Sequence, residues 1–150
     1  MTRDRPWPLL RGLALSACLL SVCRPPAPDT ASTSKGDLRI TGGFAYEPVS
    51  DASAAAYLEI ANQGKQADTL LGATSPIAAG TMLHGEGMMG MAGVVIPPGG
   101  RVLFEPGGAH IMLMTLSSLP KAGDSLRLSL HFARTGDVTV ALPVRKYGTP

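Results

Sequence analysis

Hydrophobic and polar residues alternate along most of the chain after residue 36, which is the pattern of β-strands with one buried face. The clearest run is 125–132, SLRLSLHF, where three leucines and a phenylalanine share one face. Similar runs predict strands at 37–43, 54–62, 68–74, 93–96, 101–105, 110–116 and 137–144. No segment repeats its hydrophobic residues with the 3.6-residue period of a helix.

Turn-forming residues separate the predicted strands. Proline and glycine dominate at 97–100 and 106–108, and Thr135-Gly136-Asp137 separates the last two runs. Short strands joined by regular turns are typical of sandwiches and barrels. We therefore predict an all-β fold, an antiparallel β-sandwich or Greek-key barrel, as a single domain over residues 37–150.

The first 23 residues have the layout of a bacterial export signal. Three arginines precede an apolar run from Gly12 to Val22 that is too short to span a membrane. Cys18 and Cys23 each stand where a lipid could be attached, and the sequence does not choose between them. We expect a periplasmic or cell-envelope protein, lipid-anchored if either cysteine is used and soluble if neither is. Residues 24–36, rich in proline, serine and threonine, are predicted to be a flexible linker.

Charge argues against a nucleic-acid partner. The chain has 13 Lys and Arg against 11 Asp and Glu, and four of the arginines lie in the first 24 residues. The remainder is nearly neutral and has no basic stripe, so nucleic-acid binding is not expected. Glu86 and Glu105 are the carboxylates nearest the cluster described next, and no cysteine beyond the signal could serve as a nucleophile, so we expect no enzyme.

Methionine and histidine gather in one part of the chain. Six of the seven methionines and two of the three histidines lie within 82–114, although cores use methionine sparingly. In the strand predicted at 110–116, alternation places His110, Met112 and Met114 on one face. The glycine-rich stretch 84–91 offers further donors. These are His84, Met88, Met89 and Met91.

Ligand softness indicates the ion that such donors would hold. Thioethers suit copper(I) and imidazole suits copper in either oxidation state, whereas zinc favours cysteine, histidine or carboxylate. The sequence therefore predicts a copper(I) site that includes His84, His110 and Met112. Met82 and Met114 are interpreted as core residues, with shielding of the copper site as the alternative. His131 is interpreted as a surface residue on the polar face of its strand.

The ordered set of His84, Met89-Gly90-Met91, Pro106-Gly107-Gly108 and 110–114 (HIMLM) resembles the PCuAC family of periplasmic copper chaperones. The likeness covers nearly all of residues 37–145. It implies a cupredoxin-like β-sandwich that binds copper(I) through His84, Met91, His110 and Met112. The stretch between His84 and Met91 is shorter than is usual in the family, so Met88 or Met89 could replace Met91.

The same resemblance implies a partner. Such chaperones deliver copper to the CuA centre of cytochrome c oxidase, and a thiol-bearing chaperone is another recipient we consider. Two other hypotheses remain open from the sequence. One is a copper sequestration protein. The other is a structural β-sandwich whose methionines form the core or an apolar contact patch.

Overall fold

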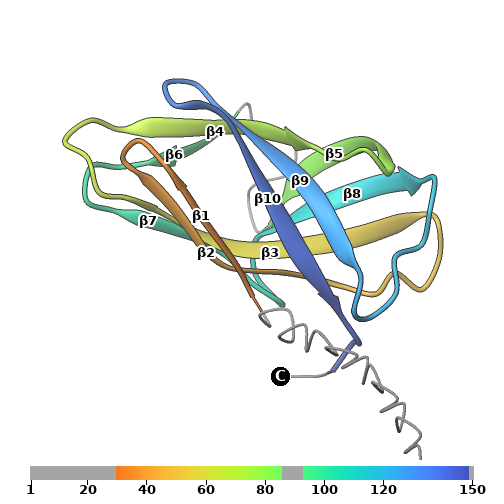
Figure 1. Cartoon of the computed structure of the whole chain (residues 1–150). Coiled ribbons are helices and arrows are strands. Elements are labelled where there is room, and N and C mark those ends of the chain that lie inside the picture. The colour runs from red at the N-terminus through yellow and green to blue at the C-terminus, as the bar shows by residue number, and fades with distance from the viewer. Residues whose placement is uncertain (1–29, 86–92, 149–150) are drawn as a thin grey trace, which may run out of the picture.

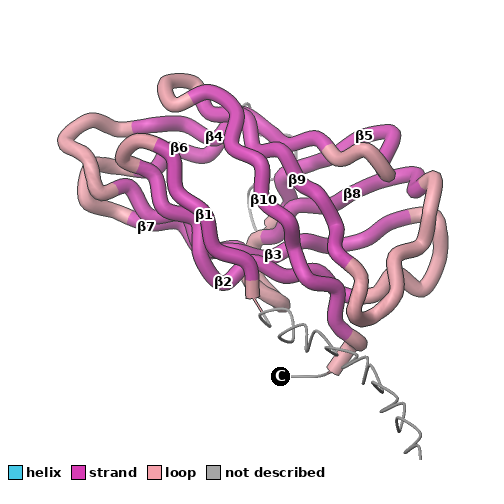
Figure 2. Tube along the Cα trace, in the orientation of Figure 1, coloured by secondary structure: helices cyan, strands magenta, loops and turns pink. Residues whose placement is uncertain are grey.

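The computed structural model describes residues 30–85 and 93–148, which form strands and loops (Figures 1 and 2). The strands are β1 (Ala31–Lys35), β2 (Leu38–Tyr46), β3 (Ser53–Asn62), β4 (Asp68–Thr74), β5 (Ala78–His84), β6 (Val94–Ile96), β7 (Arg101–Phe104), β8 (His110–Leu116), β9 (Ser125–Phe132) and β10 (Gly136–Arg145). Within the described ranges there is no helix that could cross a bilayer.

The strands form two layers. The first contains β5-β8-β3-β2 in that order, with β1 paired to β2 and β7 paired to β3; the second contains β10-β9-β4-β6. In Figure 1, β9 and β10 cross in front of β3 and β8. A short parallel pairing of β10 with β2 joins the layers, and the other pairings are antiparallel. The predicted β-sandwich is confirmed.

Alternating residues of both layers meet in one hydrophobic core. On β9, Leu128 and Leu130 have no exposed surface, as the alternation of SLRLSLHF predicts. Ile111 and Leu113 of β8 are equally buried in the opposite layer. Burying each such side chain stabilises the fold by roughly 1.5–3 kcal/mol. The inward residues of β8 are therefore fixed in the core, and its outward residues are accessible for binding.

Two strands differ from the sequence prediction. The sequence predicts residues 31–35 as part of the flexible linker, but they form β1 and pair with β2, and Ala31 is buried. The sequence predicts no strand over the residues of β5, because AAGTMLH combines small residues, a glycine and little alternation. Its antiparallel pairing with β8 supplies the order that its own sequence lacks. The predicted export signal and its two cysteines lie outside the described residues.

A buried carboxylate connects the start of β4 to the turn between β9 and β10. Asp68, only 2% exposed, accepts hydrogen bonds from the backbone N–H groups of Thr69 (2.8 Å), Arg134 (2.9 Å) and Thr135 (3.0 Å). Burial alone would raise the pKa of Asp68, but the hydrogen bonds outweigh it and the pKa is lowered. Asp68 therefore ties the start of β4 to the β9–β10 hairpin as an ionised group.

Candidate metal centre

Two histidines from separate strands face each other in the first layer. His84 ends β5 and His110 begins β8, and the antiparallel register pairs them directly. Their ring centroids are 4.8 Å apart with an angle of 50° between the ring planes. Directly opposed residues have Cβ atoms roughly 4.5–5.5 Å apart, so one ion can reach both rings. The sequence prediction that these two histidines belong together is consistent with this geometry.

The outward faces of β5 and β8 carry the soft donors. Met112 lies two residues beyond His110 on the partly exposed face, as the alternation predicts. The cross-strand partner of Met112 is Met82, which is 37% exposed. The interpretation of Met82 as a core residue is therefore wrong. Met114 is also partly exposed on the outward face and does not belong to the buried core.

A tight turn positions His110. Gly107 has φ of +82°, a conformation that favours glycine, and the N–H of Gly108 donates to the Glu105 carbonyl at 3.0 Å. The Nδ1 atom of His110 lies 3.1 Å from the Gly108 carbonyl oxygen. Because a carbonyl can only accept, this hydrogen bond requires a proton on Nδ1. The lone pair of the neutral ring is then on Nε2, the atom that could bind a metal.

His84 contains an unsatisfied buried atom. Its Nδ1 is buried and has no hydrogen-bond partner in the part of the chain that the structure describes. An unpaired buried polar atom costs about 1–3 kcal/mol. A bond to a metal ion would satisfy this nitrogen.

A pocket of about 480 Å³ opens beside the histidine pair, lined by both rings, by Tyr57 and by the turn glycines Gly107 and Gly108. The Tyr57 ring centroid is 6.3 Å from that of His110. Burial raises the pKa of Tyr57, and the neighbouring Tyr46 and Tyr147 raise it further. Tyr57 is therefore a neutral, mostly buried wall of the pocket rather than an anionic ligand.

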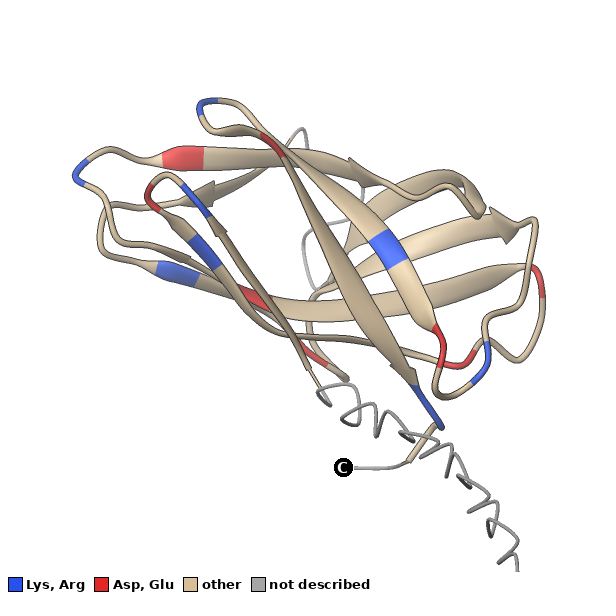
Figure 3. Ribbon diagram, in the orientation of Figure 1, with Lys and Arg blue, Asp and Glu red and all other residues tan. Residues whose placement is uncertain are grey.

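The donor set around the histidines is uncharged. Neither β5 nor β8 contains a Lys, Arg, Asp or Glu, as Figure 3 shows. Across residues 30–85 and 93–148, no three His, Cys, Asp or Glu side chains gather where they could share an ion. The donors that the described residues offer, two imidazoles with thioethers, suit copper(I) better than zinc or a hard cation.

The fourth predicted ligand, Met91, lies outside the described residues, as do its alternatives Met88 and Met89 and the carboxylate Glu86. Met91 therefore stays a prediction. His131, expected at the surface, lies on β9. Its Nδ1 is hydrogen-bonded to the Asp137 carboxylate (2.7 Å) and its Nε2 to the Thr74 hydroxyl (3.0 Å). It contributes nothing to the histidine pair.

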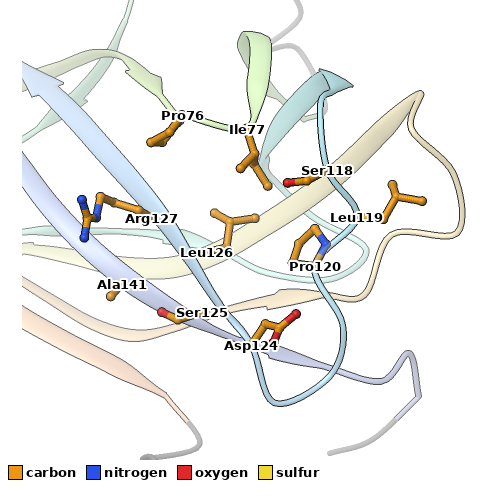
Figure 4. Close-up of a pocket in the computed structure, with 10 residues that line it drawn as sticks. All are labelled: Pro76, Ile77, Ser118, Leu119, Pro120, Asp124, Ser125, Leu126, Arg127 and Ala141. Carbon is orange, nitrogen blue, oxygen red and sulfur yellow. The ribbon is translucent and has the colours of Figure 1, made fainter.

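A separate pocket of about 540 Å³ lies between the β4–β5 turn, the β8–β9 loop and β9 (Figure 4). Asp124 and Arg127 supply its charged groups, and proline, leucine and isoleucine supply most of the rest. It contains neither histidine nor methionine. Its chemistry is therefore unrelated to the soft-donor site.

Sequence comparison assigns the family. A family described as "Putative lipoprotein LpqE-like" matches residues 38–144. The chain belongs to the LpqE-like family. A relative in Leifsonia xyli subsp. xyli, named "Putative lipoprotein Lxx21020", is 28% identical over 152 residues, which cover 93% of this chain and 91% of the relative.

Solved structures share the fold of this LpqE-like chain. The copper-bound PCuAC domain from PmoF2 is 24% identical with a TM-score of 0.71, covering 77% of this chain and 97% of that domain. The apo PCuAC domain from PmoF1 is 22% identical with a TM-score of 0.72, covering 77% and 98%. The copper(I) form of DR1885 from Deinococcus radiodurans is 26% identical with a TM-score of 0.63, covering 78% and 82%. The predicted resemblance to PCuAC domains is confirmed.

Proposed function

We propose that this LpqE-like protein binds one copper(I) ion outside the cytoplasm and passes it to another protein. The observation that carries the proposal is the cross-strand pair of His84 and His110, with Met112 next on the same face. Two structural relatives are described with copper bound, one of them with copper(I). Their fold and this donor set support the same ion, and we expect no enzymatic activity.

The proposed ligands are His84, Met91, His110 and Met112. His110 would bind through Nε2, because its Nδ1 proton is committed to the Gly108 carbonyl. The unpartnered Nδ1 of His84 supports a metal bond at that ring. Met91 would reach the ion from the segment that joins β5 to β6, and Met88 or Met89 could take its place.

Transfer follows from the charge of the ligands. Imidazole and thioether are neutral, so the complex keeps the positive charge of copper(I). A recipient that offers a thiolate supplies both a softer donor and a compensating charge, and the ion should move to it. We propose the CuA subunit of cytochrome c oxidase, or a thiol-bearing chaperone, as that recipient.

Location in the cell envelope is part of the proposal. The predicted export signal, and the names of the family and of the Leifsonia relative, support an exported protein held to the membrane through a lipid on Cys18 or Cys23. Mass spectrometry of the protein purified from membranes would test this. A diacylglyceryl modification on either cysteine supports anchoring, and an unmodified mature chain in the soluble envelope fraction contradicts it.

Anaerobic copper(I) titration of the purified protein against a competing chromophoric chelator tests the function. We expect tight one-to-one binding that weakens in Met91→Leu, with Met88→Leu and Met89→Leu as matched variants that show which methionine binds. Delivery is tested separately by mixing the copper(I)-loaded protein with an apo CuA domain. Retention of copper by the loaded protein would indicate sequestration instead.

A further inference from the structure

We propose that a second copper(I)-binding position lies on the outward face of β5 and β8, formed by the thioether sulfurs of Met82, Met112 and Met114. The inference rests on the proposed function, because it concerns the same ion. It adds a place that the ion can occupy after it leaves the histidines. Met82 and Met114 belong to this position alone, whereas Met112 is shared with the four-ligand site.

The ladder register places these methionines in a row beside the histidines. His84 pairs with His110, the next outward pair is Met82 with Met112, and the pair after that is Gly80 with Met114. A Cβ built on Gly80 would lie 3.6 Å from the terminal methyl group of Met114, so that thioether reaches over β5 where a side chain is missing. The three methionines therefore lie on one face of the sheet, with Met82 opposite Met112 on β5 and Met114 two residues beyond Met112 on β8.

Packing does not account for Met82. The neighbouring Leu83 is 6% exposed and belongs to the core, whereas Met82 on the opposite face is 37% exposed. A flexible, apolar side chain in that position adds little core stability. As a soft donor directly opposite Met112, it gives copper(I) two thioethers at cross-strand distance, roughly 5 Å between Cβ atoms.

Movement between the two positions needs no redox chemistry. Successive outward residues of a strand are roughly 7 Å apart, so the ion travels about one ladder step. Bonds from copper(I) to imidazole nitrogen break, bonds to thioether sulfur form, and Met112 can remain bound throughout. No electron or proton has to be supplied. The thioether position would hold the ion more weakly than the histidine site and would present it at an exposed edge.

The test uses the purified protein carrying His84→Ala together with His110→Ala, titrated anaerobically with copper(I) against a weak chelator. We expect this protein to retain one weakly bound ion, and Met82→Leu in the same background to weaken it by about tenfold or more. Leu103→Met is the matched control, because it adds a lone exposed thioether on β7, where the replaced leucine is 48% exposed. It should leave the affinity unchanged.

Methyl NMR of the protein without substitutions provides a second readout that does not depend on how variants fold. Copper(I) added beyond the first equivalent meets a Met112 already bound to the first ion, so it should bind through Met82 and Met114 and shift their methyl signals. The proposal is overturned if the histidine variant binds no copper(I), if Met91→Leu rather than Met82→Leu removes the residual ion, or if the two methyl signals stay fixed. A different result would contradict the proposed function: the same copper(I) affinity in the parent protein and in the double histidine variant.

Discussion

His84 and His110 stand directly opposite each other across β5 and β8, with ring centroids 4.8 Å apart. Each belongs to a strand whose inward residues, Leu83 and Ile111, are locked in the core. The pair is therefore positioned by the sheet itself, and a site built on regular strands keeps its geometry without the ion.

Removal of either histidine should weaken copper(I) binding by about 100-fold or more, because the loss of a direct ligand costs at least as much as the loss of a residue that orients one. Since both rings bind one ion, the effects of His84→Ala and His110→Ala should be far from additive. Chelator competition measures the two single variants and the double variant. His131→Ala, on β9 of the other layer, is the control and should bind as the parent does.

Copper(I) affinity should fall as the solution is made mildly acidic. A protonated imidazole cannot donate a lone pair, so protons compete with the ion for both rings. The measurement is the same competition titration at several pH values, corrected for protonation of the chelator. An affinity that stays constant between neutral and mildly acidic pH would count against histidine ligation.

Gly85→Ala should disturb the site through the backbone. A Cβ at Gly85 would lie 2.9 Å from the Ala109 Cα and 3.1 Å from its Cβ, so β5 and β8 would have to separate just beside the histidine pair. We expect a loss of about 1–3 kcal/mol in unfolding free energy, together with weaker copper(I) binding. Denaturant unfolding and chelator competition measure the two effects.

Gly72→Ala is the matched control, because a Cβ there meets no heavy atom within 4 Å. Its stability should stay within about 0.5 kcal/mol of the parent. Equal losses in the two variants would show that the close approach of Gly85 to Ala109 is not what matters.

Asp68→Asn should lower stability by about 1–3 kcal/mol at neutral pH, because the buried carboxylate accepts three backbone hydrogen bonds. The lowered pKa of Asp68 means that its contribution is present at neutral pH and is lost as pH falls through the acidic range below about 4. The variant should therefore lose less stability on acidification than the parent. Urea unfolding at several pH values tests this, with the exposed Asp51→Asn as the control. An unchanged pH profile in Asp68→Asn would contradict the assignment.

The alternation of residue types was enough to determine the strand class, most of the strand positions and the orientation of β8. His110 and Met112 share a face because side chains in any β-strand alternate with a period of two, whatever the strand pairs with. The glycines before His110 likewise indicated a tight turn from local chemistry alone. The soft character of the donors indicated copper(I) for the same reason, since it depends on residue type and not on position.

Tertiary structure decided the rest. The small-residue segment that forms β5 becomes a strand because it pairs with the distant β8, and such non-local pairing leaves little trace in a segment's own sequence. The polar segment that forms β1 becomes a strand through its hairpin with β2, although its own residues lack the alternation of a buried strand. The register that sets His84 against His110 also sets Met82 against Met112. Met82 therefore faces outward and lies outside the core in which the sequence alone would place it. Register depends on which faces of two distant strands are buried together, and one strand's pattern does not specify its partner.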